Sequence, residues 1–351
     1  MPGSPHLYGM LPDDLTSFLR GRGVAVRDGE SRRILGHAVA RGLDGFPLAR
    51  PVPRVLADAV ALLVDRRPLE IVERAIDPSD NFVKYLFRLR DGAMVEAVRI
   101  PLERPGRFTV CLSSQAGCAM RCAFCATGRL GLVRNLRPWE IVGQFLAVRN
   151  EAPGLVTGAL FQGQGEPLHN YDAVMTAAAI LSEPCAGRVA AKAITISTVG
   201  MVPGILRMAR ELRPYRLIVS MTSAIDDVRR TLLPAASSWT VEELAAAVRT
   251  YQASLGRRVT LAWVVLGGVN TNSEEVAALR RLFAGVPIKV NLIDVNDARP
   301  DGFRRATPSE LDRFRDELRT LEMPIVRRYS GGAARHAACG MLASLRTANT
   351  S

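Results

Sequence analysis

Three cysteines in one short run are the residues whose type and spacing most clearly suggest chemistry. Cys118, Cys122 and Cys125 follow the order C-x3-C-x2-C, directly after an apolar stretch that is expected to form a strand. Thiolates packed this closely in one loop usually bind a metal ion or an iron–sulfur cluster. A structural zinc site usually needs four ligands, and no C-x2-C or H-x3-H pair elsewhere completes this one. Three thiolates on an iron–sulfur cluster would leave one iron open for a ligand that takes part in the reaction.

The other three cysteines stand apart from this run. Cys111 lies in the strand expected just before it, and Cys339 lies in a glycine-rich segment at 330–340, after the last expected strand. Cys185 is interpreted as a structural or incidental thiol. In a reducing compartment we expect none of the six to form a structural disulfide.

Composition indicates an ordinary soluble globular chain. Its 351 residues are 48% hydrophobic and 23% charged, which excludes a disordered chain, a collagen and a small disulfide scaffold. No apolar run approaches the roughly 18 residues of a membrane span. The first fifteen residues lack the basic start and apolar core of a secretory signal. We therefore expect a cytoplasmic protein without a membrane association.

The charge balance favours a polyanionic partner. Lys and Arg number 46 against 34 Asp and Glu, a formal net charge of +12, and only Lys84, Lys192 and Lys289 are lysines. A basic excess of this size favours nucleic acid, because each neutralised phosphate releases condensed counterions. The alternative is that the arginines are evenly scattered and only reflect the base composition of the genome. Aromatic residues make up only 6% of the chain, so phosphate contacts from arginine are expected to outweigh base stacking.

From about residue 155 apolar runs typical of strands alternate with helical patterns. The expected strands are 108–114, 156–162, 192–198, 215–222, 258–266, 288–295 and 324–329. The expected helices are 171–181, 203–212, 241–254, 273–283 and 309–321, with Thr240 and Ser273 as N-cap residues of two of them. Repeated βα units predict a parallel sheet and an α/β fold with a full or partial barrel.

The residues before the barrel divide into two smaller units. The segment 82–100 alternates around Asp91-Gly92, which predicts a hairpin that feeds the first barrel strand. The segment 15–64 is rich in helix formers and is interrupted at 42–52. We therefore expect a small helical accessory domain at 1–64, a β extension at 65–104, the barrel core at 105–345 and a tail at 346–351.

The cysteine run, with an aromatic residue before its third cysteine, resembles the radical-SAM superfamily. Further blocks along about residues 94–345 look like the RlmN/Cfr family of RNA methyltransferases, in the same order. They are Cys111-Leu-Ser-Ser-Gln-Ala-Gly-Cys118, Arg134-Asn-Leu136, Gly165-Glu-Pro-Leu168, Ser197-Thr198, Asn291-Leu-Ile293 and Ala338-Cys-Gly340. The resemblance implies a partial (β/α)6 radical-SAM barrel and a [4Fe-4S] cluster whose open iron chelates S-adenosylmethionine.

By the same resemblance, Cys118, Cys122 and Cys125 hold the cluster. The resemblance also assigns the contacts with S-adenosylmethionine, which would be made by Gly165, Glu166, Ser197, Ser220, Met221, Thr222 and Asn296. Each of these positions falls at or just beyond the carboxyl end of an expected strand, the rim where βα barrels build active sites. Taken singly, a Ser or Asn at such a position is as readily explained as part of a turn or as a helix cap as by a role in cofactor binding.

The catalytic roles implied by the resemblance fall on Cys339, Cys111 and Glu96. One S-adenosylmethionine methylates Cys339 and a second is cleaved at the cluster, and the resulting radical takes a hydrogen from the S-methyl group. The methylene then adds to carbon 2 or carbon 8 of an adenine. Glu96 removes the adenine proton, and Cys111 releases the product through a transient disulfide with Cys339. The implied partners are ribosomal RNA or tRNA and a flavodoxin-type electron donor.

The chain also departs from the family pattern. Gly163-Gln164-Gly165-Glu166 replaces a methionine-containing loop, and Ser220-Met221-Thr222 stands in place of Ser-Leu-His. The N-terminal unit lacks the family's aromatic-rich middle. Two alternatives therefore stay open: an enzyme of the same mechanism acting on a different RNA or nucleotide, and a non-catalytic RNA-binding protein stabilised by a metal.

Overall fold

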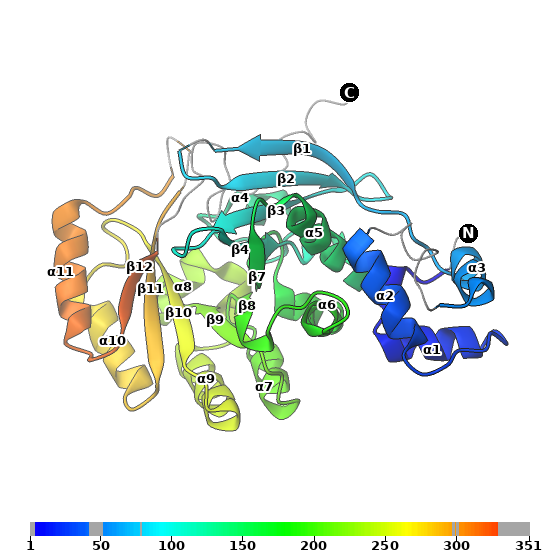
Figure 1. Cartoon of the computed structure of the whole chain (residues 1–351). Helices are drawn as coiled ribbons and strands as arrows, with labels where there is room; N and C mark the ends of the chain where they lie inside the picture. The colour runs from blue at the N-terminus through cyan, green and yellow to red at the C-terminus, as the bar shows by residue number, and fades with distance from the viewer. Residues whose placement is uncertain (1–3, 42–51, 78, 297–298, 300–301, 329–351) are drawn as a thin grey trace.

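The computed structural model describes residues 4–41, 52–77, 79–296, 299 and 302–328 (Figure 1). Its central element is a ten-stranded sheet in the order β1-β2-β3-β4-β7-β8-β9-β10-β11-β12. A separate two-stranded ribbon pairs β5 with β6. The strands are β1 Glu70–Ile76, β2 Val83–Arg88, β3 Met94–Pro101, β4 Arg107–Leu112, β5 Gln115–Gly117, β6 Leu132–Asn135, β7 Leu155–Phe161, β8 Ile194–Thr198, β9 Arg216–Ser220, β10 Val259–Val265, β11 Ile288–Asp294 and β12 Ile325–Arg328.

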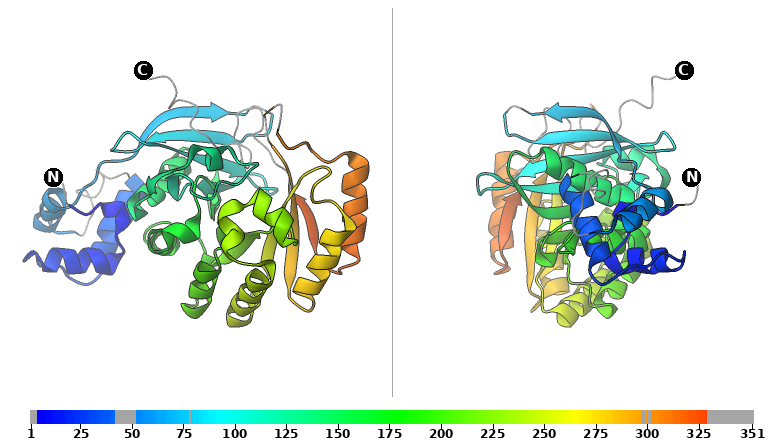
Figure 2. Two further views of the ribbon diagram at one scale, coloured as in Figure 1. Left: turned by 180° about the vertical axis from the view of Figure 1, so that it is seen from behind. Right: turned by 45° about the vertical axis from the view of Figure 1, so that its right-hand side comes forward.

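The helices follow the strands in the order that βα units require. They are α1 Pro12–Arg20, α2 Glu30–Arg41, α3 Arg54–Leu63, α4 Ala126–Leu130, α5 Pro138–Glu151, α6 Tyr171–Ser182, α7 Val202–Arg210, α8 Asp226–Leu232, α9 Val241–Leu255, α10 Ser273–Phe283 and α11 Pro308–Arg319. Short 3-10 helices are η1 Leu7–Gly9, η3 Pro167–Asn170, η4 Ala191–Ala193 and η5 Pro234–Ser238. Figure 2 shows the N-terminal helices at one end of the molecule and the barrel helices along the outer side of the strands.

The parallel strands confirm the expected partial barrel. Strands β4, β7, β8, β9, β10, β11 and β12 pair in parallel with their neighbours, so six βα units are followed by a last strand. Strand β10, Val259–Val265, has buried or partly buried residues on both faces. Burial on both faces is typical of parallel sheets that are covered by helices.

Helix caps show how local sequence fixes the element boundaries. The Thr240 side chain accepts a hydrogen bond from the N–H of Glu243, as expected for an N-cap. The second predicted cap is wrong by one position. Asn272 caps α10 by accepting from the N–H of Glu275, and Ser273 is the first helical residue. The amide oxygen of Asn272 takes this role, and both residue types are strong N-caps.

The expected hairpin is present, and it joins the barrel through an antiparallel edge. β2 pairs with β3 across Asp91-Gly92, and β3 pairs with β4. An additional strand, β1, pairs with β2. In the β3–β4 register Val98 lies opposite Cys111. This pairing fixes which residues of the hairpin share a face with the first barrel strand.

The N-terminal helices pack on the barrel through aromatic and arginine contacts. The ring of His6 stacks on Trp139 of α5, with 4.3 Å between centroids and 16° between planes. Burial lowers the pKa of His6 to about 4, so the stacked imidazole is neutral at physiological pH. Arg149 of α5 donates to the carbonyl of Val39 on α2 at 3.1 Å. One continuous hydrophobic core therefore runs from η1 into the barrel.

No helix in the described part of the chain is long and apolar enough to cross a lipid bilayer.

Candidate active site

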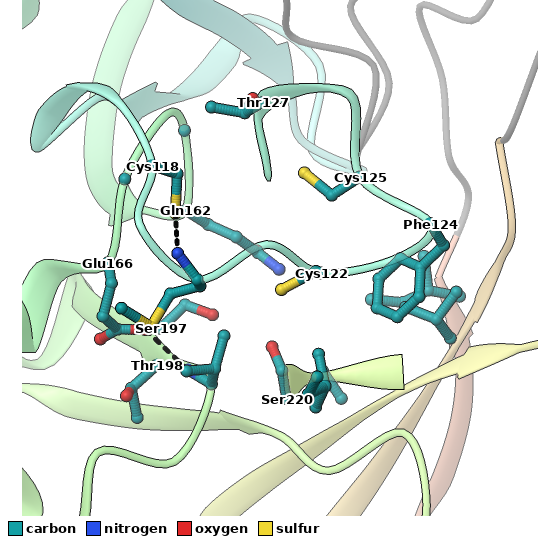
Figure 3. A pocket seen from close by; sticks show the side chains of 18 of the residues that line it. Cys118, Cys122, Phe124, Cys125, Thr127, Gln162, Glu166, Ser197, Thr198 and Ser220 are labelled. Carbon is teal, nitrogen blue, oxygen red and sulfur yellow. Dashed lines mark hydrogen bonds between the residues drawn. The ribbon is translucent and has the colours of Figure 1, made fainter. Parts of the chain in front are cut away.

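A cavity lies at the carboxyl ends of the parallel strands. Figure 3 shows the cysteine side chains on one side of it and those of Glu166, Ser197 and Ser220 on another. Loops converge at this end of a parallel barrel, so side chains distant in sequence meet there. The predicted residues that line the cavity are Cys118, Cys122, Cys125, Gly165, Glu166, Ser197, Ser220 and Asn296.

Backbone contacts hold the cysteine loop at both ends. The N–H of Cys118 donates to the carbonyl of Gly131 at 2.8 Å, and the N–H of Ala123 donates to the carbonyl of Leu232 at 3.0 Å. Gly117 has a φ of +72°, and a Cβ there would lie 1.9 Å from the carbonyl oxygen of Gly131. Only glycine therefore allows the chain to enter the loop along this path.

Two thiols of this loop, those of Cys118 and Cys122, have raised pKa values. Burial raises the pKa of Cys118 to about 11. Burial, and after it repulsion from Cys125 and Cys118, raises the pKa of Cys122 well above its usual range. Metal binding deprotonates such thiols because the cation compensates the thiolate charge. The three cysteines, which face one cavity, therefore fit a group that carries several positive metal ions.

The number of thiols bears on which metal group the loop can hold. Three thiolates on an iron–sulfur cluster leave one iron open, whereas a structural zinc site usually takes four ligands. Three thiols of the loop line the cavity, so the site fits an iron–sulfur cluster better than a structural zinc ion.

Two glycines bring the loop after β7 against the segment after β4. A Cβ on Gly163 would lie 2.7 Å from the carbonyl carbon of Leu112, and one on Gly165 would lie 2.5 Å from Cβ of Gln115. The side-chain oxygen of Gln115 accepts from the N–H of Glu166 at 2.8 Å. The segment that leads into the cysteine run therefore also positions Glu166.

Glu166 is a buried carboxylate at the edge of the cavity. Its oxygens accept hydrogen bonds from the N–H of Leu168 at 2.9 Å and from the N–H of Val199 at 2.8 Å. Burial raises its pKa to about 7, although these donors favour the charged form. A cationic group entering the cavity would therefore meet a carboxylate that is already oriented.

Hydrogen bonds from Arg229, a residue that was not predicted from the sequence, hold the ends of β8 and β9. Arg229 of α8 is 3% exposed. Its guanidinium donates to the carbonyl of Ser220 at 3.0 Å and to the carbonyls of Met221 and Val199. This arginine fixes the strand ends that carry Ser197 and Ser220.

Two predicted cofactor-binding residues lie outside the cavity lining. Met221 is fully buried in the main core, and Thr222 is fully buried next to it in the chain. The carbonyl of Thr222 accepts from the side-chain amide of Asn270 at 2.6 Å. Asn296 does line the cavity, and its side-chain oxygen accepts from Arg305 at 2.7 Å.

Glu96 and Cys111 lie on one face of the antiparallel edge. Cys111 is opposite Val98, and Glu96 lies two residues before Val98, so both side chains point to the same side of the sheet. Diagonal neighbours of this kind are about 7–8 Å apart. The hydroxyl of Ser113 donates to the carbonyl of Glu96 at 2.5 Å, and Nζ of Lys84 lies 3.2 Å from its carboxylate. Cys339, the third predicted catalytic residue, lies outside the described residues.

Some cavity residues were not predicted. Gln162, Thr198 and Asp294 line it at the ends of β7, β8 and β11. These three residues could have been predicted from the sequence, because each stands at the carboxyl end of an expected strand. Asp294 pairs with Arg327 of β12 at 2.8 Å.

Comparisons with known proteins agree with this geometry. The model of the radical SAM superfamily matches residues 112–280. A protein of Anaeromyxobacter sp. (strain Fw109-5), named as a probable RNA methyltransferase, is 49% identical over 339 residues, which cover 95% of this chain and 98% of that protein. The dual-specificity RNA methyltransferase RlmN of Syntrophotalea carbinolica is 36% identical over 331 residues, covering 94% and 87%.

A solved structure resembles the whole fold. The crystal structure of a radical SAM methyltransferase from Sphaerobacter thermophilus has a TM-score of 0.87 at 36% identity, and the match covers 96% of this chain and 98% of that one. The non-catalytic alternative does not agree with these relatives. The chain is an enzyme of the radical SAM superfamily and belongs to the RNA methyltransferases of the RlmN type.

Proposed function

We propose that this enzyme methylates carbon 2 or carbon 8 of an adenine in RNA through an S-methylcysteine intermediate on Cys339. The observation that carries the proposal is the shared face of β3 and β4. There a buried carboxylate, Glu96 of β3, and a buried thiol, Cys111 of β4, lie as diagonal neighbours, and β4 leads to the three-cysteine loop. A base and a thiol in one place are what the release of a cysteine-bound product requires.

The cavity residues divide between the two cofactors. Cys118, Cys122 and Cys125 would hold a [4Fe-4S] cluster, and Glu166 would bind the ammonium group of S-adenosylmethionine. Bound together, the cluster and S-adenosylmethionine supply a 5′-deoxyadenosyl radical. Ser197, Ser220 and Asn296 line the cavity and offer hydrogen bonds to the rest of S-adenosylmethionine. Met221 and Thr222 would act by shaping the end of β9, since their side chains are buried elsewhere and their carbonyls accept from Arg229 and Asn270.

The catalytic cysteines take separate steps. Cys339 carries the methyl group, and two molecules of S-adenosylmethionine are used in one turnover. After the methylene carbon has joined the adenine, Glu96 accepts the proton of the substituted ring carbon. The thiolate of Cys111 then attacks the sulfur of Cys339, so that a disulfide forms and the bond between this sulfur and the methylene carbon breaks. The electron pair of the broken bond goes to the carbon, which takes up a proton to become the methyl group. A thiol must reduce the disulfide before the next turnover.

The substrate is proposed from the names of the relatives and from charge. The relatives are named as RNA methyltransferases, and the net charge of +12 suits a phosphate backbone. We propose ribosomal RNA or tRNA as the substrate and a flavodoxin-type protein as the electron donor.

Replacement of Cys339 by alanine is expected to leave cluster absorbance and S-adenosylmethionine binding unchanged and to reduce methyl transfer below detection. Alanine lacks the sulfur that carries the methyl group. The matched control is Cys185→Ala, because Cys185 is a half-buried thiol outside the cavity. Transfer from labelled S-adenosylmethionine to total RNA measures the effect. Methylated product from the Cys339 variant would contradict the proposed carrier.

A further inference from the structure

A buried ion pair lies beside Cys111 in the antiparallel part of the sheet. Nζ of Lys84 lies 3.2 Å from Oε1 of Glu96, and the two side chains are 13% and 3% exposed. Lys84 on β2 is opposite Val98, which makes it a diagonal neighbour of Glu96 on β3. The sheet register therefore sets this pair.

The charge of Lys84 acts on the pKa of Glu96. Burial raises this pKa above its usual value, and the ammonium of Lys84 is the largest factor that opposes the rise. Glu73 of β1 raises the pKa of Glu96 further. Cys111 of β4 is another titratable side chain on this face among the described residues. Without Lys84, Glu96 would lie near an acid in an apolar surrounding, and its pKa would rise further.

The two oxygens of Glu96 are in different situations. Oε1 contacts Lys84, whereas Oε2 is buried and has no hydrogen-bond partner among the residues that the structure describes. A buried carboxylate oxygen without a partner is costly, so its retention calls for an explanation. One explanation is that Oε2 is kept available to accept a proton from the substrate.

The residue type of Lys84 is also informative. Of the 46 basic residues, three are lysines, and one of these is the buried partner of Glu96. A guanidinium fork tends to bind both oxygens of a carboxylate, whereas an ammonium is a point charge that can contact one. Lysine therefore neutralises Glu96 and leaves Oε2 available.

We propose that Lys84 is a positioning residue, whose ammonium binds Oε1 of Glu96 so that Oε2 stays ionised and open as the acceptor of the adenine proton. The inference rests on the proposed function, which makes Glu96 the base. In the step itself, the C–H bond of the substituted adenine carbon breaks, its electron pair stays in the ring, and the proton goes to Oε2. Lys84 keeps its proton throughout.

A single-turnover assay at several pH values tests this role through the loss of the covalent protein–RNA adduct, followed on denaturing gels. In Lys84→Met the adduct should resolve about tenfold more slowly than in the wild type at neutral pH. Because Glu96 must be ionised to act, and its pKa is higher without Lys84, the rate should recover as pH rises. Lys84→Arg keeps the positive charge but should also slow the loss of adduct, because its guanidinium fork can bind both oxygens and cover Oε2. The exposed Lys192→Met is the matched control.

The pH profile separates positioning from a structural role. A Lys84→Met rate that equals the wild-type rate, or one that is reduced equally at every pH, would overturn the proposal. Glu96→Gln should accumulate adduct with no recovery at high pH, because it has no carboxylate to ionise.

An infrared titration of the carboxyl band that disappears in Glu96→Gln gives a second readout that needs no turnover. The midpoint of the band should lie at a lower pH in the wild type than in Lys84→Met. Equal midpoints in the two proteins would overturn the proposal. If no protein forms an RNA adduct, the proposed function fails, and the infrared titration still decides whether Lys84 controls Glu96.

Discussion

Replacement of Cys122 by serine is expected to give a folded protein that holds no iron–sulfur cluster and transfers no methyl group. Serine is close to cysteine in size, so the buried position tolerates it. A hydroxyl, however, does not ionise as a thiol does beside iron, and two thiolates remain. Cys122 is buried in the loop, between backbone contacts made by Cys118 and Ala123.

Iron and sulfide content per chain, measured after anaerobic reconstitution, tests this expectation. Cys185→Ser is the matched control, since Cys185 lies outside the cavity and its loss should leave iron content unchanged. A Cys122→Ser protein that holds iron at the wild-type level would remove Cys122 from the ligand set.

The substitution Gly165→Ala is expected to destabilise the fold and to abolish S-adenosylmethionine binding. Gly165 has a φ of +99°, and a Cβ would lie 2.5 Å from Cβ of Gln115 and 2.8 Å from its backbone nitrogen. Backbone atoms cannot move aside cheaply, so the loop must shift, and Glu166 shifts with it. We expect a loss of about 3 kcal/mol or more in the free energy of unfolding.

Gly92→Ala is the control for Gly165→Ala, because Gly92 has a φ of +84° and a Cβ there would meet no atom within 4 Å. It should cost only about 1 kcal/mol, the strain of a left-handed backbone without crowding. Urea unfolding and equilibrium dialysis with S-adenosylmethionine measure the two effects. Equal losses for the two variants would mean that crowding against Gln115 does not matter.

The barrel strands and the β2–β3 hairpin could be predicted because their signals are local. Apolar runs bounded by turn residues mark the strands, and Asp91-Gly92 marks the turn. Helix α5 was missed, since nine of its fourteen residues are buried and it lacks the polar face by which a helix is recognised. β1 was missed because its residues are mostly exposed or half-buried and give no apolar run.

Some features of the candidate site could likewise be predicted from the sequence, and others could not. The cysteine run could be found from the sequence because its three cysteines lie in one loop. The contact between Glu166 and the N–H of Val199 could not, because it depends on β7 and β8 being neighbours. The pairing of Lys84 with Glu96 could not be predicted either, because it depends on the register of β2 on β3. In the sequence, Arg229 is an ordinary helix arginine, and only the structure shows its three carbonyl acceptors.

The central claim, that a methylene group on Cys339 joins protein and RNA, is tested most directly with the Cys111→Ala protein. This variant is incubated anaerobically with RNA and S-adenosylmethionine that carries deuterium at all positions of its methyl group, and the conjugate is digested for mass spectrometry. The account predicts a peptide with Cys339 joined to adenosine through a carbon that keeps two deuterium atoms, because one is removed before the bond forms. A free methylated adenosine with three deuterium atoms and no conjugate would contradict it.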